Sequence, residues 1–84
     1  MVHDLSRPEK RVVGMKQVLK FAHSAKLDKV FIAKDADEMI ISKLTHVCET
    51  NKIPYDLMYT MHQIGSACQI DVGSACAAVI KLPD

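Results

Sequence analysis

The 84-residue sequence has no tryptophan, and its aromatic residues are limited to two phenylalanines and two tyrosines. We therefore expect a core built from aliphatic side chains and methionine, which are among the residue types most often buried. The sequence also lacks an excess of charge, because eleven Lys and Arg residues stand against ten Asp and Glu residues. This near balance excludes a strongly basic tail, so any binding of a polyanion must depend on a local arrangement of side chains.

Long apolar runs are also missing. No window of the sequence approaches the roughly 18 apolar residues that a membrane-spanning helix needs, and the N-terminal segment is too polar for the apolar region of a signal peptide. We therefore expect no membrane association and a cytoplasmic location. The length fits one small domain over residues 1–84 with a core of modest size.

Patterns for metals, cofactors and disulfides are absent. The three cysteines are odd in number and widely spaced among apolar neighbours, which indicates core residues in a reducing compartment. There is no C-x-x-C pair, and the four histidines are scattered, so no metal site is predicted. The glycines form neither a G-x-G-x-x-G nor a P-loop pattern, and no cofactor is expected. The residues that these statements concern are Cys48, Cys68, Cys76, His3, His23, His46, His62, Gly14, Gly65 and Gly73.

Catalysis has little support in the sequence. Asp35 and Asp37 are close together, but Asp35 is better explained as the N-cap of the following helix, with Glu38 completing a capping pattern. No Ser, Cys or His residue has a recognisable partner for nucleophilic or acid–base chemistry. We therefore predict no catalytic residues and no enzyme.

Helical and strand patterns alternate along the chain. The first helix is expected near residues 6–9 with Ser6 as N-cap and Pro8 in the first turn. Further helices are expected over about 15–25, from Asp35 to about residue 50, and from Thr60 to residue 68, where Gly65 would be a weak point. Strands are expected at 12–13, 30–33, 53–58 and 75–80, the second of them buried on both faces. This alternation favours a mixed or parallel sheet between layers of helices, an α/β fold.

The segment from Gly14 to Lys20 is the most informative part of the sequence. Apolar residues recur at helical spacing and would leave a polar face beside the first free N–H groups of the helix, which attract phosphate. The residues of that face are Lys16, Gln17, Lys20 and His23. The Gln17 amide can both donate and accept hydrogen bonds, as base edges require. The alternative is that Gly14 merely ends a strand and that the polar face is only solvated.

The Ile70–Gly73 loop and the side chain of Ile41 each allow two interpretations. The loop Ile70-Asp71-Val72-Gly73 could be an ordinary turn with two apolar anchors, or its aliphatic side chains could press against an unpaired base. Ile41 lies at the edge of the apolar stripe of its helix. We expect it to belong first to the core and only second to a ligand contact.

Several segments together resemble one RNA-binding family. They occur in the right order and with similar spacing from about Arg11 to Lys81. The landmarks are Gly14-x-Lys16-Gln17-x-x-Lys20, Ala33-Lys34-Asp35-Ala36-Asp37, Ile53-Pro54-Tyr55, Ile64-Gly65-Ser66-Ala67-Cys68 and Ile70-Asp71-Val72. This set resembles the L7Ae/L30e family of ribosomal proteins, whose members bind kink-turn RNA.

The resemblance implies a three-layer α/β/α sandwich with a four-stranded mixed sheet. It also implies recognition of a sharply bent RNA that has a short bulge beside tandem sheared G·A pairs. Residues implied to lie along the RNA, with the glutamine reading guanine edges, are Gly14, Lys16, Gln17 and Lys20. A pocket for a flipped-out nucleotide would be lined by Lys34, Asp37 and Ile41. The loop that covers the bulged bases would be formed by Ile70, Asp71 and Val72.

The sequence departs from the family pattern at two places. Archaeal and eukaryotic relatives usually carry Asn-Glu where this chain has Lys16-Gln17, whereas bacterial ribosomal-protein-like members look like this chain. An amide in place of a carboxylate removes a charge-assisted acceptor and should weaken binding, which Lys16 offsets in part by attracting phosphate. Met61 stands where many relatives have a lysine.

The leading hypothesis is a bacterial, monomeric RNA-binding protein that acts within or alongside the ribosome. Its partner would be a kink-turn in ribosomal RNA, an mRNA leader or a riboswitch. The alternative is a protein-interaction or scaffolding subunit that keeps the family fold without specific RNA binding. A small hydrolase or nucleotide-binding enzyme is the third and least favoured hypothesis.

Overall fold

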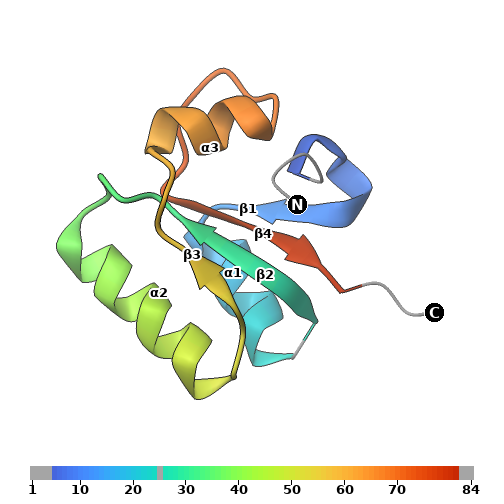
Figure 1. Cartoon of the computed structure of the whole chain (residues 1–84). Coiled ribbons are helices and arrows are strands. Elements are labelled where there is room, and N and C mark those ends of the chain that lie inside the picture. The colour runs from blue at the N-terminus through green and yellow to red at the C-terminus, as the bar shows by residue number, and fades with distance from the viewer. Residues whose placement is uncertain (1–4, 25, 82–84) are drawn as a thin grey trace.

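The computed structural model describes residues 5–24 and 26–81. Helices and strands alternate along the chain (Figure 1), as the sequence patterns indicated. In order they are a 3-10 helix (Pro8–Lys10), β1 (Arg11–Val13), α1 (Met15–His23), β2 (Leu27–Ile32), α2 (Glu38–Thr50), β3 (Tyr55–Asp56), α3 (Met61–Ala67) and β4 (Cys76–Ile80). Within this part of the chain no helix is long and apolar enough to cross a membrane.

The four strands form one mixed sheet in the order β1-β4-β2-β3. β4 runs antiparallel to both β1 and β2, while β2 and β3 are parallel. β1, β2 and β3 therefore point in the same direction and end at the same edge of the sheet, where β4 begins. This edge lies on the left in Figure 1, and α1, α2 and α3 all start there.

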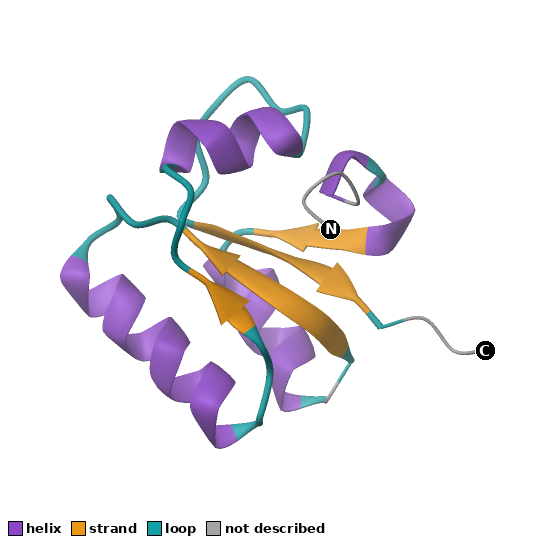
Figure 2. Cartoon of the chain, in the orientation of Figure 1, coloured by secondary structure: helices purple, strands orange, loops and turns teal. Residues whose placement is uncertain are grey.

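Helices cover both faces of the sheet (Figure 2), and this confirms the three-layer α/β/α sandwich. Side chains alternate between the faces along β2, as they do in any strand. Val30 and Ile32 pack in the core beneath α1 and α2, whereas Phe31 and Ala33 pack beneath α3. All four are at most 1% exposed, so the prediction of a strand buried on both faces is also confirmed.

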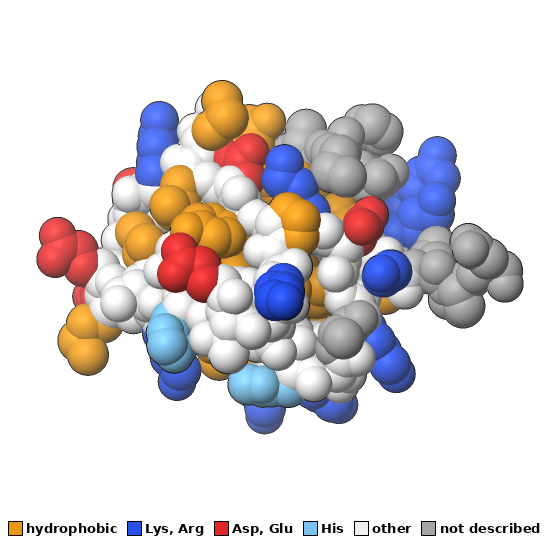
Figure 3. Space-filling view, turned by 60° about the horizontal axis from the view of Figure 1, so that its bottom comes forward, with side chains coloured by type: hydrophobic (Ala, Val, Ile, Leu, Met, Phe, Trp, Pro, Cys, Tyr) orange, Lys and Arg blue, Asp and Glu red, His pale blue; other side chains and the backbone are white. Residues whose placement is uncertain are grey.

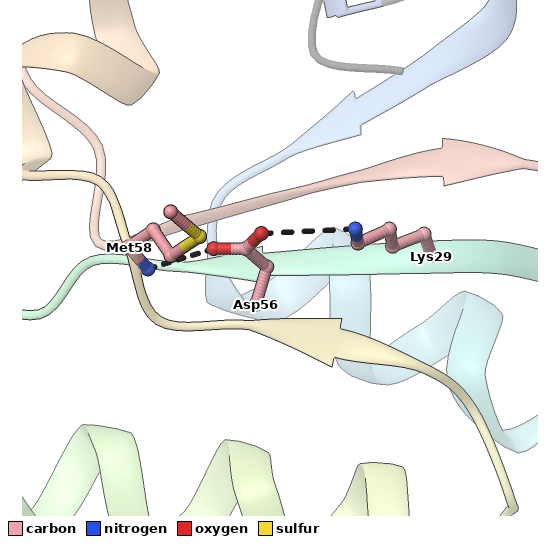
Figure 4. A network of polar contacts seen from close by, with 3 residues as sticks. All are labelled: Lys29, Asp56 and Met58. Carbon is pink, nitrogen blue, oxygen red and sulfur yellow. Dashed lines mark hydrogen bonds and ion pairs between the residues drawn. The ribbon is translucent and has the colours of Figure 1, made fainter.

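Two strands were predicted with bounds that are wrong by two or three residues, because β2 was expected at 30–33 and β3 at 53–58. At the start of β2 and at the end of β3, polar residues are stabilised by contacts that the local pattern does not show. β2 begins at Leu27 and includes Lys29, whose Nζ lies 3.7 Å from Asp56 Oδ2 and 5.2 Å from the centre of the Phe31 ring. β3 ends at Asp56, because the same carboxylate accepts a 2.7 Å hydrogen bond from Met58 N and turns the chain. Figure 4 shows this link between Lys29, Asp56 and Met58.

The helical turn at Pro8–Lys10 also differs from the prediction. It is a 3-10 helix with Arg7 at the N-cap position and no side-chain cap hydrogen bond, so the assignment of Ser6 as N-cap was wrong. Pro8 occupies the first turn, as expected, because its fixed φ suits that position.

Gly65, which was expected to be a weak point of its helix, has a packing role that the sequence did not reveal. Gly65 is buried, and a Cβ placed there would overlap the carbonyl oxygen of Val72 and lie 3.0 Å from Gly73 Cα. The missing side chain therefore lets the loop that contains Val72 pack directly against α3.

All three cysteines are buried and free, which confirms their assignment to the core. Burial, followed by the charge of Glu49, raises the pKa of Cys48 to about 11. Burial, followed by the nearby Cys48, raises the pKa of Cys76 to about 12. Burial also raises the pKa of Cys68, against the opposing charge of Arg11.

We predict that none of these thiols reacts with an Ellman-type reagent in the native protein at pH 8, because the thiolate is the nucleophile. All three should react once the chain is unfolded in denaturant. Above the usual thiol pKa of 9.0, the unfolded chain releases protons that the folded state still holds. The free energy of unfolding should therefore keep the full contribution of the buried thiols below pH 9. It should fall as the pH rises from 9 toward the raised pKa values of about 11 for Cys48 and about 12 for Cys76. Rapid labelling of the native protein at pH 8 would contradict this prediction.

Candidate nucleic-acid interface

Four segments meet at the edge of the sheet where β1, β2 and β3 end. We call this region the loop edge and define it as residues 14–20, 33–39, 57–61 and 70–75. Backbone hydrogen bonds join residues 33–39, 57–61 and 70–75 to one another and join Gly14 to Cys76, the first residue of β4, which directly follows residues 70–75. They run from Gly14 N to Cys76 O (3.0 Å), from Ala33 N to Ala75 O (2.8 Å), from Lys34 N to Tyr59 O (2.8 Å) and from Ser74 N to Met61 O (3.1 Å).

Gly14 allows α1 to start directly after β1. Its φ of 90° and ψ of 156° lie in a region that residues with a side chain rarely adopt. A Cβ at this position would meet no atom within 4 Å, so the requirement for glycine comes from the backbone conformation and not from crowding. No side-chain cap bond covers the N-terminus of α1, and its first turn contains no acidic residue.

The structure confirms the amphipathic interpretation of α1. Val18 and Ala22 are fully buried, whereas Lys16, Gln17 and Lys20 are exposed. Residues three or four apart lie on the same face of a helix, so Lys20 shares a face with both Lys16 and Gln17. Lysine and histidine side chains gather along the lower rim in Figure 3, on the side where α1 and α2 cover the sheet.

The loop between β2 and α2 corrects the prediction for its two aspartates. Asp37, not Asp35, is the N-cap of α2, and its Oδ1 accepts a 2.8 Å hydrogen bond from Met39 N. Asp35 Oδ1 instead accepts a 2.8 Å bond from Met61 N, at the start of α3. The Asp35–Glu38 spacing fits a capping pattern, but the side chain of Asp35 is held by a residue 26 positions away in the sequence.

The three residues implied for a nucleotide pocket lie around the start of α2. Lys34 and Asp37 are exposed, and Asp37 O accepts the 3.0 Å bond from Ile41 N, which places Ile41 one helical turn further along. Ile41 is half-buried and packs against the core beneath α1 and α2, which confirms it as a core residue first. A surface hollow lies beside them on the outer face of α2, lined by Glu38, Met39, Ser42, Lys43 and His46.

The Ile70–Gly73 loop has one anchored and one projecting apolar side chain. Ile70 is half-buried against the core beneath α3, and its N–H donates a 3.0 Å bond to Gly65 O. Val72 is 70% exposed, and Asp71 and Gly73 are exposed beside it. Ile70 therefore acts as an anchor of the turn, while Val72 is presented to solvent.

Sequence reasoning missed a concentration of apolar side chains at the loop edge. In the described part of the chain, the large hydrophobic side chains that are exposed all belong to its segments: Met39, Leu57, Met58, Met61 and Val72. Exposed apolar side chains gathered in one region commonly mark a binding surface. The Leu57-Met58 pair in the β3–α3 connection was a usable signal, but it had been assigned to a strand.

The candidate site is a surface rather than a metal centre. Among residues 5–24 and 26–81, no group of three or more His, Cys, Asp or Glu side chains could hold a metal ion. Exposed lysines, an exposed amide and exposed aliphatic groups surround one end of the sheet. Their combination suits a ligand that has both negative charges and flat apolar faces.

These features define a small α/β/α sandwich that presents a binding edge at the starts of its helices. The model of the Ribosomal protein L7Ae/L30e/S12e/Gadd45 family matches residues 2–84, and the chain belongs to this family. The resemblance inferred from the sequence landmarks is thereby confirmed.

Individual relatives cover most of the chain. The "RNA-binding protein TTE2299" of Caldanaerobacter subterraneus subsp. tengcongensis is 46% identical over 71 residues, which are 84% of this chain and 87% of that protein. The "RNA-binding protein YbxF" of Geobacillus stearothermophilus is 33% identical over 86% of this chain and 88% of its own length. The structure is also similar to that of the Giardia lamblia 15.5kD RNA binding protein, with a TM-score of 0.86, 28% identity and coverage of 96% of this chain and 68% of the other.

Proposed function

We propose that this chain binds RNA through the loop edge and specifically recognises a kink-turn, which it holds in the bent conformation. The observation that carries the proposal is the joining of the exposed Lys16–Gln17–Lys20 face and the exposed Val72 loop at one end of the sheet. The names of the bacterial relatives and of the Giardia lamblia protein support RNA as the ligand.

Each part of the surface has a chemical task in this proposal. Lys16 and Lys20 attract phosphates, next to the N-terminal N–H groups of α1. Gln17 donates to and accepts from the edges of the sheared G·A pairs. Val72 and the neighbouring loop cover the unpaired bases of the bulge, whose faces are apolar.

The pocket for the flipped-out nucleotide is proposed at the start of α2. Lys34 is exposed there and can meet the RNA backbone. Asp37 lines the pocket with the carboxylate oxygen that its cap bond from Met39 N leaves free. Ile41 contributes only the part of its side chain that the core leaves exposed.

The protein would stabilise the bent RNA by binding that conformation in preference to the extended one. A kink-turn exchanges between extended and bent forms, and a protein that contacts only the bent form shifts the population toward it by the difference in binding free energy. The loop edge would make these differential contacts, because the phosphates, G·A edges and bulged bases converge only when the RNA is bent.

The proposed setting is the bacterial cytoplasm, where the protein acts as a monomer within or alongside the ribosome. The kink-turn could belong to ribosomal RNA, an mRNA leader or a riboswitch. These sources present the same bent geometry, so the loop edge would use the same residues for each.

The test is a titration at fixed magnesium and moderate salt into an RNA hairpin whose two ends carry dyes that report the bend. The control hairpin has Watson–Crick pairs in place of the G·A pairs. We expect saturable binding and bending only for the kink-turn. Equal, weak binding to both hairpins that salt abolishes would overturn the proposal and favour a protein-interaction subunit.

The substitution Met61→Lys tests whether the loop edge contacts the phosphates of the RNA. The Met61 side chain is 36% exposed at the start of α3, at a position where the family resemblance implies a lysine in many members. We predict tighter binding to kink-turn RNA and a plot of log K against log salt that steepens by about 0.9, the value for one more phosphate contact.

The control for this prediction is Thr50→Lys, which adds the same charge at the exposed C-terminal end of α2, away from the loop edge. It should leave the salt slope nearly unchanged. The prediction fails if both lysines steepen the slope equally, since binding would then follow net charge and not position.

A further inference from the structure

We infer that Asp35 is a positioning residue, which sets the conformation of the Ile70–Gly73 loop through the backbone of Met61. Sequence reasoning assigned Asp35 only a capping role on α2, and the structure gives that role to Asp37. The effect of Asp35 on RNA binding rests on the proposed function, whereas its effect on the loop does not.

The inference starts from a chain of hydrogen bonds that crosses the loop edge. Asp35 Oδ1 accepts from Met61 N at 2.8 Å, and Met61 O accepts from Ser74 N at 3.1 Å. Ser74 is 8% exposed, and its hydroxyl donates a 2.6 Å bond to Cys76 O at the start of β4. Asp35 is thus connected through the backbone of one residue, Met61, to Ser74, which directly follows the loop.

The loop also lies in direct contact with the start of α3. A Cβ placed on Gly73 would lie 3.2 Å from Met61 C and O and 3.3 Å from Met61 Cβ, so the two backbones are closely packed. Any shift of Met61 therefore moves the surface against which Gly73 and its neighbour Val72 rest.

α3 is short, and three side chains accept hydrogen bonds from the backbone at its N-terminus. Thr60 accepts from Gln63 N at 3.1 Å, while the Gln63 side chain accepts from Thr60 N at 2.9 Å. Asp35 supplies the acceptor for Met61 N, which this capping box leaves unpaired. Without Asp35 the capping box would remain, but the first residue of α3 would lose its link to the β2–α2 loop.

The chemistry separates the hydrogen bond from the charge. Asp35 accepts a hydrogen bond from Met61 N and carries a negative charge that repels phosphate, and substitutions can remove these two properties separately. Asp35→Asn keeps an oxygen that can accept from Met61 N and removes the charge. Asp35→Ala removes both. Asp37→Ala is a matched control, because it deletes the same type of bond, to Met39 N, from the same loop.

The first experiment is amide hydrogen exchange on the full chain without RNA. Asp35→Ala should speed exchange of the Ser74 amide, which donates to Met61 O, at least about fivefold, the size expected when one hydrogen bond is lost. Asp35→Asn should stay within about twofold of the parent protein. Asp37→Ala should speed exchange in the first turn of α2 and leave Ser74 unchanged. Unchanged Ser74 exchange in Asp35→Ala would overturn the inference.

The second experiment measures binding of the same variants to the kink-turn hairpin. Asp35→Ala should bind more weakly with faster dissociation, and Asp35→Asn should bind at least as tightly as the parent protein. Equal weakening by both variants would overturn the positioning role, because the charge and not the hydrogen bond would then matter. If the parent protein itself fails to bend the hairpin, the proposed function fails, and the exchange experiment alone decides the inference.

Discussion

Gly65→Ala is expected to destabilise the protein by about 1–3 kcal/mol, the usual cost of forcing extra volume into a packed region. The added methyl would overlap the Val72 carbonyl oxygen, a backbone atom that cannot rotate away. Helix propensity alone predicts the opposite, since alanine is better than glycine inside a helix by about 1 kcal/mol. The sign of the change in unfolding free energy, measured by urea denaturation, therefore decides between the two effects.

Ser66→Ala is the matched control, because Ser66 is the next residue of α3 and is exposed. It should change stability by less than about 0.5 kcal/mol, as most surface substitutions do. Gly65→Ala should also weaken binding to the kink-turn hairpin, because the displaced loop carries Val72. A rise in stability for Gly65→Ala would show that the loop does not rest on α3 as described.

Gln17→Ala is expected to weaken binding to kink-turn RNA by about 1–3 kcal/mol, the discrimination that one good base contact supplies. The side chain is exposed on α1, so the stability of the free protein should change by less than about 0.5 kcal/mol. Binding to plain duplex RNA should be unaffected, because duplex RNA does not present the G·A edges.

Lys20→Ala is the comparison for this prediction, since Lys20 lies on the same face of the same helix. It should weaken binding to both RNAs and lower the slope of log K against log salt by about 1, as the loss of one phosphate contact requires. Equal losses for Gln17→Ala on kinked and plain RNA would contradict its base-reading role.

The sequence predicted most of the fold because its signals are local. The apolar spacing in residues 15–22 identified α1, and Thr60 with Gln63 identified the start of α3 through a capping box that the structure contains. The two-face burial of residues 30–33 followed from a continuous apolar run. In each case neighbouring residues determine the conformation, so a pattern can reveal it.

The errors concern contacts between residues far apart in the sequence. Two aspartates precede α2; Asp37 caps the helix through Met39 N, while Asp35 is held by Met61 N, a distant residue that the local pattern could not reveal. Gly65 looked like a defect because the loop that packs on it follows later in the chain. β2 started too late in the prediction, because Lys29 pairs with Asp56 of a different strand.

The candidate site was predicted only in part, because its local patterns are visible in the sequence and its contacts between distant segments are not. The exposed face of α1 follows from helical periodicity, and Val72 was named as an exposed apolar residue. The exposed Met61 side chain was not recognised as a neighbour of that loop, because the contact between Met61 and Gly73 joins distant segments.

The most direct test of the central claim is to map backbone amide chemical shifts of the full chain while kink-turn RNA is added. The account predicts the largest changes at residues 14–20, 34–37 and 71–73 and little change near residues 46–52, at the opposite end of α2. Asp35→Asn should retain this pattern. Changes concentrated at the C-terminal end of α2, with residues 14–20 unaffected, would contradict the assignment of the loop edge as the RNA-binding surface.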